Sequence, residues 1–146
     1  MHITYKGDYA LKTILDLAVH YGNGPVTINY LAKRADIPVK FLEQILLDLK
    51  RGGFVQSRRG KIGGYFLAKE PVRIRLGDVI RFIDGPIEPV GCVAKNYKGC
   101  KDINNCVLRG VWKKIFNATC GVVDNITFED LAKDAKKTQT TFTYQI

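Results

Sequence analysis

Three of the four cysteines in this sequence of 146 residues lie close together, at Cys92, Cys100 and Cys106. Thiolates bind zinc ions and iron–sulfur clusters alike, so these residue types leave the metal open. The spacing C-x7-C-x5-C, with no histidine nearby, fits neither the paired knuckles of a zinc finger nor a ferredoxin motif. Metal-free redox thiols are a third interpretation. Cys120 lies apart, and we interpret it as a buried structural thiol.

The stretch that carries Cys92 and Cys100, residues 86–105, has no helical or strand periodicity. About twenty irregular residues inside a compact chain are usually functional or disordered, and a bound metal would give them a reason for order. Residues 76–83 predict a short helix before this stretch, and residues 106–125 predict a long helix after it. The long helix has an apolar seam that favours packing against another helix: Leu108, Val111, Ile115, Ala118 and Val122.

The first third of the chain predicts three helices. Apolar residues recur at helical spacing over 8–21, and again over 28–35, where Thr27 is placed to cap the helix. After a short turn, a third helix is expected from Pro38 to Gly52, because proline is tolerated in a first helical turn and glycine ends a helix. The last two of these helices, joined by a tight turn, form a helix-turn-helix.

Two short strands, 54–55 and 65–67, are predicted next, joined by a basic and glycine-rich turn that makes a wing. Near the C-terminus, Thr127 and Asp130 match a capping box for a last short helix that ends near Lys136. The expected fold is therefore mainly α, with a small β-hairpin wing: a winged helix-turn-helix domain plus a long helix.

The charge balance favours a polyanionic partner. The sequence has 23 Lys and Arg against 14 Asp and Glu, a formal net charge of +9. Nucleic acid is the first expectation, and an anionic membrane surface the second. No apolar run approaches the roughly 18 residues of a membrane-spanning helix, and the N-terminus lacks the apolar core of a signal peptide, so we expect a cytoplasmic protein.

Basic residues concentrate on the predicted helix-turn-helix and wing. Residues 33–61 hold eight basic and three acidic side chains, as neutralisation of DNA phosphates requires. On the third helix, polar side chains able to reach base edges are Lys40, Glu43 and Gln44. The wing turn, 57–64, offers cations to the minor groove. The full set expected to bind DNA is Lys33, Lys40, Glu43, Gln44, Arg58, Arg59 and Lys61, although a solvated surface is the alternative for each.

Catalysis is not expected. The sequence has no nucleophile paired with a base, no phosphate-binding P-loop and no dinucleotide fingerprint. Its one glycine-rich run, GKIGG at 60–64, lies in the predicted wing turn between two strands, where it cannot open a phosphate-binding helix.

Four segments resemble the IscR/NsrR/CymR (Rrf-type) family of bacterial winged-helix regulators: GDYALKTILDLA at 7–18, IPVKFLEQILLDLKRGGFVQSRRGKIGGYFLA at 37–68, LGDVIRFIDGP at 76–86 and CVLRGVW at 106–112. The resemblance covers nearly the whole chain. It implies a homodimer whose long helices pair, each wing domain reading half of a pseudo-palindromic site in double-stranded DNA. The implied segments are a DNA-binding domain over 1–84, a cluster loop over 85–105, and a dimerisation helix with a C-terminal segment over 106–146.

The resemblance also implies site residues. Base contacts transfer to Glu43 and Lys40, although Lys40 departs from the small hydroxyl residue often found there, and the minor-groove arginine transfers to Arg59. The three clustered cysteines would ligate an iron–sulfur cluster, [2Fe-2S] or [4Fe-4S]. Arg109 occupies the position of a histidine ligand in one branch and cannot bind a metal.

A fourth ligand must therefore come from elsewhere. Asp8 matches the aspartate that the nitric-oxide-sensing branch supplies from the opposite subunit, although an N-cap or first-turn carboxylate of the helix is the alternative reading. A bound water, a small thiol or another residue are the other options for the fourth ligand. The implied protein is a repressor that senses iron–sulfur, nitric oxide or redox status. Alternatives of the same fold are a zinc-binding regulator and a cluster-free regulator controlled by thiol oxidation or a partner protein.

Overall fold

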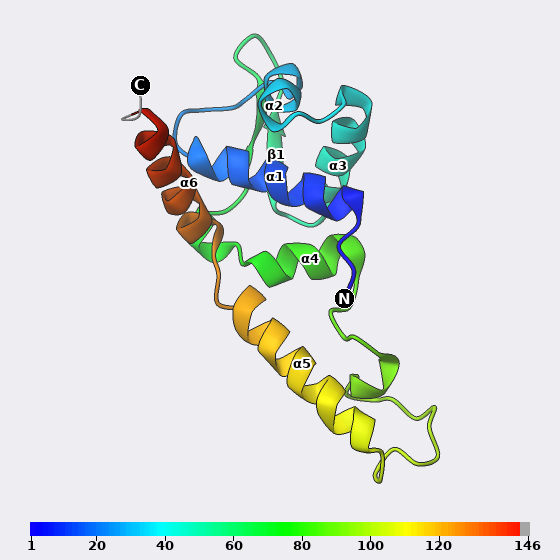
Figure 1. Ribbon diagram of the computed structural model, residues 1–146. Coiled ribbons are helices and arrows are strands. Elements are labelled where there is room, and N and C mark those ends of the chain that lie inside the picture. The colour runs from blue at the N-terminus through cyan, green and yellow to red at the C-terminus, as the bar shows by residue number, and fades with distance from the viewer. Residues whose placement is uncertain (144–146) are drawn as a thin grey trace.

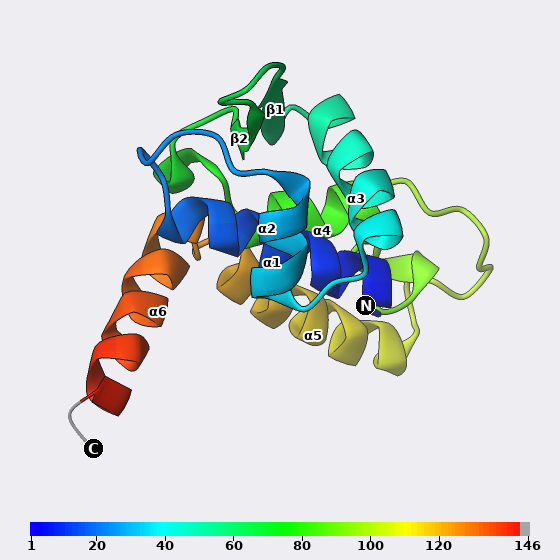
Figure 2. The ribbon, with the colours of Figure 1, turned by 90° about the horizontal axis from the view of Figure 1, so that it is seen from above.

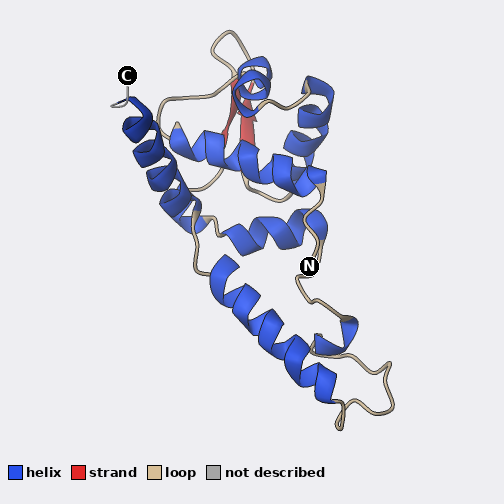
Figure 3. Ribbon diagram, in the orientation of Figure 1, coloured by secondary structure: helices blue, strands red, loops and turns tan. Residues whose placement is uncertain are grey.

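The computed structural model describes residues 1–143, and the side chains of residues 1–139. It confirms the predicted fold class: helices with one two-stranded antiparallel hairpin (Figures 1 and 3). The elements are α1 (Tyr5–Val19), α2 (Ile28–Ala35), α3 (Val39–Arg51), β1 (Val55–Arg58), β2 (Gly64–Leu67), the 3-10 helix η1 (Pro71–Arg73), α4 (Leu76–Asp84), the 3-10 helix η2 (Gly91–Val93), α5 (Val107–Val123) and α6 (Phe128–Thr143).

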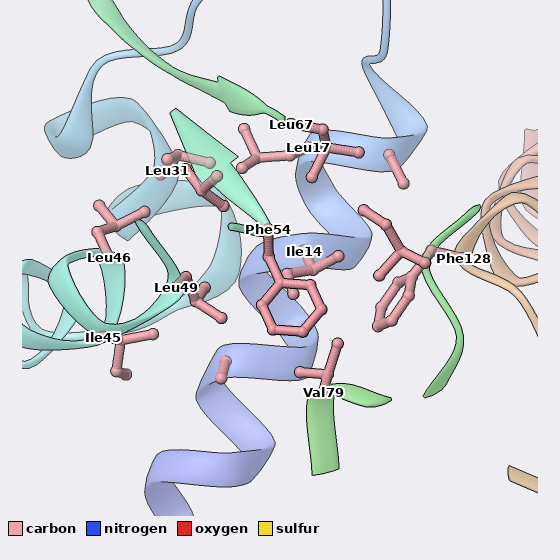
Figure 4. Packing of buried hydrophobic residues seen from close by; sticks show 14 of the residues in the cluster. Ile14, Leu17, Leu31, Ile45, Leu46, Leu49, Phe54, Leu67, Val79 and Phe128 are labelled. Atoms are coloured by element: carbon pink, nitrogen blue, oxygen red, sulfur yellow. The ribbon is translucent and has the colours of Figure 1, made fainter. Parts of the chain in front are cut away.

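Helix α1 lies at the centre of the main core and contacts α2, α3, α4, α6 and β2. Its Ala10 and Ile14 are fully buried, because residues four apart fall on the same face of a helix. Figure 4 shows Ile14 among side chains from the surrounding elements, including Phe54, Leu49 and Val79. Burial of each such side chain contributes roughly 1.5–3 kcal/mol. This core fixes the orientation of α3 and of the wing.

Helix α6 returns to that core. Phe128, its first residue, is fully buried, and the helix packs against α1. The predicted capping box is confirmed: Thr127 Oγ1 donates to Asp130 Oδ2 at 2.6 Å, and Asp130 N–H donates to Thr127 Oγ1 at 3.2 Å. These bonds hold the pKa of Asp130 below its usual range. The segment 106–146 therefore includes a helix that packs against the predicted DNA-binding domain. The predicted boundaries between the three segments of the chain stay predictions.

The expected end of this helix near Lys136 is wrong, since α6 continues to Thr143. The physical reason is that no glycine or proline follows Phe128 to interrupt the helix. Ion pairs one turn apart, such as Lys133 with Glu129 at 3.0 Å, support its solvated face. Residues 144–146, the end of the expected C-terminal segment, lie outside the described residues.

Helix α5 extends away from the main core (Figure 1). Of its residues only Val123 is buried, in a small cluster with Ile80 and Ile87. Arg81 of α4 holds the end of α5 through two hydrogen bonds to Asp124, at 2.6 and 3.0 Å. The guanidinium holds the pKa of Asp124 below its usual range. None of the described helices is long and apolar enough to cross a membrane.

Candidate nucleic-acid interface and cysteine loop

A tight turn sets the angle between α2 and α3. Asp36, the C-cap of α2, has a φ of 53°, in the left-handed region that Asp tolerates better than most residues. Ile37 is buried and donates its N–H to Ala32 O at 3.0 Å, and Pro38 is the N-cap of α3. Thr27 holds the predicted N-cap position of α2, but its side chain makes no capping hydrogen bond. This turn places α3 at the surface.

The outer face of α3 carries the three predicted base-reading residues. Lys40, Glu43 and Gln44 are exposed, whereas Leu42 and Ile45 on the inner face are 0% and 1% exposed. Figure 1 shows α2, α3 and the hairpin tip at the same end of the molecule, on the side of α1 away from α5. The sequence produces this arrangement because the apolar positions recur at three and four along α3.

The wing is the antiparallel pair of β1 and β2 (Figure 2), with Arg58 opposite Gly64. Arg59 and Lys61 are exposed at its tip, and Lys33 is exposed on α2. The expectation that Arg58 belongs to the turn is wrong: it ends strand β1, because the chain does not turn until Gly60, whose φ is 112°. The guanidinium of Arg58 lies over an aromatic ring of β2, that of Phe66, at 5.9 Å from the ring centroid.

An ion pair that sequence reasoning missed locks α3 onto α1. Lys6 Nζ lies 2.6 Å from Asp48 Oδ2, and Arg51 Nη1 lies 3.5 Å from Asp48 Oδ1. The Lys6 ammonium holds the pKa of Asp48 below its usual range, so the carboxylate stays charged. At the end of α3, Lys50 Nζ donates to Ser57 Oγ of the wing at 2.7 Å. These contacts join α1, α3 and the wing.

The cysteine loop begins where α4 ends. Cys92 lies half-buried in η2, whereas Cys100 and Cys106 are exposed, and all three are free thiols. The expectation that Cys120 is buried is wrong: it is half-buried on α5, where Arg81 Nη2 donates to its Sγ at 3.5 Å. Among the side chains of residues 1–139, no three His, Cys, Asp or Glu are close enough together to hold a metal ion. The donor chemistry of three free thiols fits an iron–sulfur cluster, but the single chain does not bring them together.

Arg109 and Asp8, the two further residues considered as metal ligands, have partners of their own. Arg109 of α5 donates Nε–H to the Cys92 carbonyl at 2.9 Å, a contact that fixes one end of the loop. Asp8 lies in the first turn of α1 and pairs with Lys12 Nζ at 2.7 Å, and this carboxylate raises the pKa of Lys12. The N-cap of α1 is instead Thr4.

Thr4 also connects α1 to the start of the cysteine loop. Its N–H donates to Asp84 Oδ2 at 3.0 Å, and its hydroxyl donates to Asp84 Oδ1 at 2.5 Å. Asp84 is the last residue of α4, directly before the loop. Eighty positions separate the two residues, and nothing in the local sequence of either signals the contact.

The apolar seam predicted on α5 is left uncovered by its own chain. Val107 is 85% and Leu108 61% exposed, and Val111, Ile115 and Val122 are exposed as well. A row of large apolar side chains along one helix favours a partner surface, because a monomer seldom leaves such a patch in water.

Comparison with known proteins gives consistent matches. A family profile described as "Iron-dependent Transcriptional regulator", Rrf2, matches residues 3–134. An rrf2-like HTH-type transcriptional regulator of Rhodobacter capsulatus is 39% identical over 136 residues, 88% of this chain and 91% of the relative. The regulator IscR of Serratia proteamaculans is 34% identical over 134 residues, 92% of this chain and 80% of the relative.

Two solved structures are similar over most of their length. CymR, the global cysteine regulator of B. subtilis, has a TM-score of 0.78 and 35% identity, covering 91% of this chain and 97% of CymR. IscR of T. potens has a TM-score of 0.74 and 34% identity, covering 95% of this chain and 91% of IscR.

Proposed function

Because the chain belongs to the Rrf2 family of transcriptional regulators, which are not enzymes, we propose that it is a homodimeric, operator-binding repressor. It senses iron–sulfur, nitric oxide or redox status through an iron–sulfur cluster on its cysteine loop. The observation that carries this proposal is the combination, in one chain, of an exposed basic winged helix-turn-helix and a loop with three free thiols.

The DNA interface consists of α3 in the major groove and the wing, with Arg58, Arg59 and Lys61, at the minor groove. Lys40, Glu43 and Gln44 read base edges in the major groove, because Lys approaches guanine, Glu accepts from cytosine N4 and Gln pairs with adenine. Lys33 and Lys61 neutralise phosphates, and Arg59 enters the minor groove. The exposure of the polar side chains on the outer face of α3 supports this assignment, while the Lys6–Asp48 ion pair connects α3 to α1.

The homodimer forms along α5. The exposed apolar residues of α5 pack against the same residues of a second copy, which a two-fold axis makes self-complementary. Substitution of Ile115 by glutamate places a charge in this interface, so the variant is expected to sediment as a monomer while its helical content stays unchanged. A variant that stays dimeric would contradict α5 as the interface.

The cluster ligands within one subunit are Cys92, Cys100 and Cys106, and Asp8 of the opposite subunit is the fourth. A bound cluster would supply iron-based redox chemistry at this site. The chain's own part is to connect the loop to the DNA-binding unit. Asp84 holds Thr4 at the N-terminus of α1, and Lys6, half a turn later, holds Asp48 of α3. A rearrangement of the loop can therefore move α3.

The test combines metal analysis with DNA binding on protein purified without oxygen. We expect stoichiometric iron and acid-labile sulfide in the wild type, loss of both in Cys92→Ala, and retention in the matched control Cys120→Ala. Asp8→Ala decides the fourth ligand, with Asp134→Ala as a control because Asp134 is a solvated carboxylate on α6. Equal operator affinity of protein with and without the cluster would refute cluster sensing.

A second candidate is a cluster-free regulator controlled by thiol oxidation or a partner protein. The similarity to CymR, a cysteine regulator, favours it. Zinc is the third possibility for the same thiols. Protein that takes up no iron or sulfide on reconstitution would support the cluster-free regulator, and zinc content at one ion per chain would support the zinc site. Either outcome leaves the DNA-binding proposal intact.

A further inference from the structure

A cavity of about 440 Å³ lies between the end of α1 and the wing. Its floor is apolar, because it is formed by Leu17 and Leu67. These two side chains are only 4% and 5% exposed. The α1–α2 connection and both wing strands complete the wall, with His20, Val26, Arg58 and Phe66 among the lining residues. The volume falls within the range of sites that hold small organic molecules.

Backbone hydrogen bonds fix one wall of the cavity. Val26 N–H donates to Tyr65 O at 2.9 Å, and Tyr65 N–H donates to Val26 O at 2.8 Å, so the α1–α2 connection is joined to strand β2. Gly64 permits this approach, because a Cβ there would lie 2.4 Å from Val26 O. A pre-formed wall lowers the entropy cost of binding.

The polar groups of this cavity are suited to an anion. Arg58 lines it, and no carboxylate among residues 1–139 forms an ion pair with this guanidinium. His20 also lines the cavity; its Nδ1 lies 2.9 Å from Asp16 O, which leaves Nε2 as the ring nitrogen without that contact. None of the residues that line the cavity is acidic. An arginine beside an apolar wall matches a carboxylate attached to an apolar body.

We propose that this cavity, the wing pocket, binds a small organic carboxylate, whose apolar body rests on Leu17 and Leu67 and whose carboxylate pairs with Arg58. The pocket connects directly to the DNA-binding surface, because Arg58 precedes Arg59 of the wing tip. An anion on Arg58 removes a positive charge from the wing and weakens DNA binding. This effect rests on the proposed function, whereas the binding itself does not.

Binding is tested by calorimetry on the intact protein without DNA, with hexanoate and phenylacetate as probes and their amides as neutral controls. We expect the carboxylates to bind at least about tenfold more tightly than the amides, since a hydrogen bond between charged groups exceeds a neutral one by that much. Arg58→Gln should abolish this preference. Arg59→Gln, with the same charge change outside the pocket, should keep it.

Equal binding of amides and carboxylates, an equal loss in both arginine variants, or no binding of any probe would each overturn the pocket. The DNA arm measures operator affinity with and without the bound carboxylate, and we expect a several-fold loss of affinity. Ligand binding that leaves operator affinity unchanged overturns the link to the wing. A protein that binds the carboxylate but no DNA at all instead refutes the proposed function.

Discussion

Replacement of Gly7 by alanine tests the junction between α1 and α4. A Cβ at Gly7 would lie 2.0 Å from Asp84 Oδ2, so the Asp84 side chain must move away. That movement breaks the two hydrogen bonds that Thr4 donates to Asp84. Bonds to a charged group are worth about 1.5–3 kcal/mol each, and exposure reduces these two to about 1 kcal/mol each.

The helix propensity of alanine offsets part of this loss, by about 1 kcal/mol relative to glycine. Gly7→Ala is therefore expected to lower the free energy of unfolding by about 1 kcal/mol net. In an Asp84→Ala background the carboxylate is gone, so the same change should raise it by about 1 kcal/mol. The sign of the Gly7→Ala effect thus reverses between the two backgrounds.

Urea denaturation measures the free energy of unfolding of the wild type, the two single variants and the double variant. The protein concentration is held fixed, because the proposed dimerisation would make apparent stability concentration-dependent. Equal effects of Gly7→Ala in both backgrounds would refute the proposed steric conflict with Asp84. A separate DNA-binding measurement on the wild type and Gly7→Ala checks the route from the cysteine loop to α1. Weakening the junction between Thr4 and Asp84 should reduce any difference in operator affinity between oxidised and reduced protein.

Phe128→Ala should destabilise the protein by about 3–5 kcal/mol in the same assay, because the side chain is fully buried, whereas Ile62→Ala at the exposed wing tip should cost less than about 0.5 kcal/mol. The pKa of Asp124 lies below its usual range beside Arg81, so this pair adds stability at neutral pH that is lost as the pH falls through the folded-state pKa. The destabilisation by Asp124→Asn should accordingly shrink in acid, and a constant difference between pH 7 and about 3 would contradict the pairing. Lys61→Gln should reduce the slope of log affinity against log salt by about 1 in operator titrations, and an unchanged slope would exclude a phosphate contact of Lys61.

The sequence alone predicted the elements whose causes are local. The helix-turn-helix and the hairpin follow from apolar spacing and glycine positions, and Thr127 with Asp130 predicted a capping box that the structure contains. A cap depends on residues three apart, so the sequence holds all the information it needs. The family resemblance was likewise readable from contiguous segments, and the family match confirms it.

The Rrf-type site residues remain predictions for a different reason. The three cysteines and Asp8 belong, in the proposed function, to a site completed by a second subunit, and a single chain leaves Cys100 and Cys106 exposed. The proposed homodimer gives the exposed apolar face of α5 the same cause, because its partner surface would lie on another copy. Neither spacing nor composition specifies geometry across such an interface.

Only the tertiary structure decided the contacts that join distant elements. Thr4 meets Asp84 across eighty positions, and Arg81 meets Asp124 across forty-three. Arg58 lines the wing pocket because the strands pair as far as Gly64, which no local pattern signalled. Such contacts depend on how packed helices and strands are oriented in space, and that orientation arises from the shared core around α1 rather than from the residues that happen to meet.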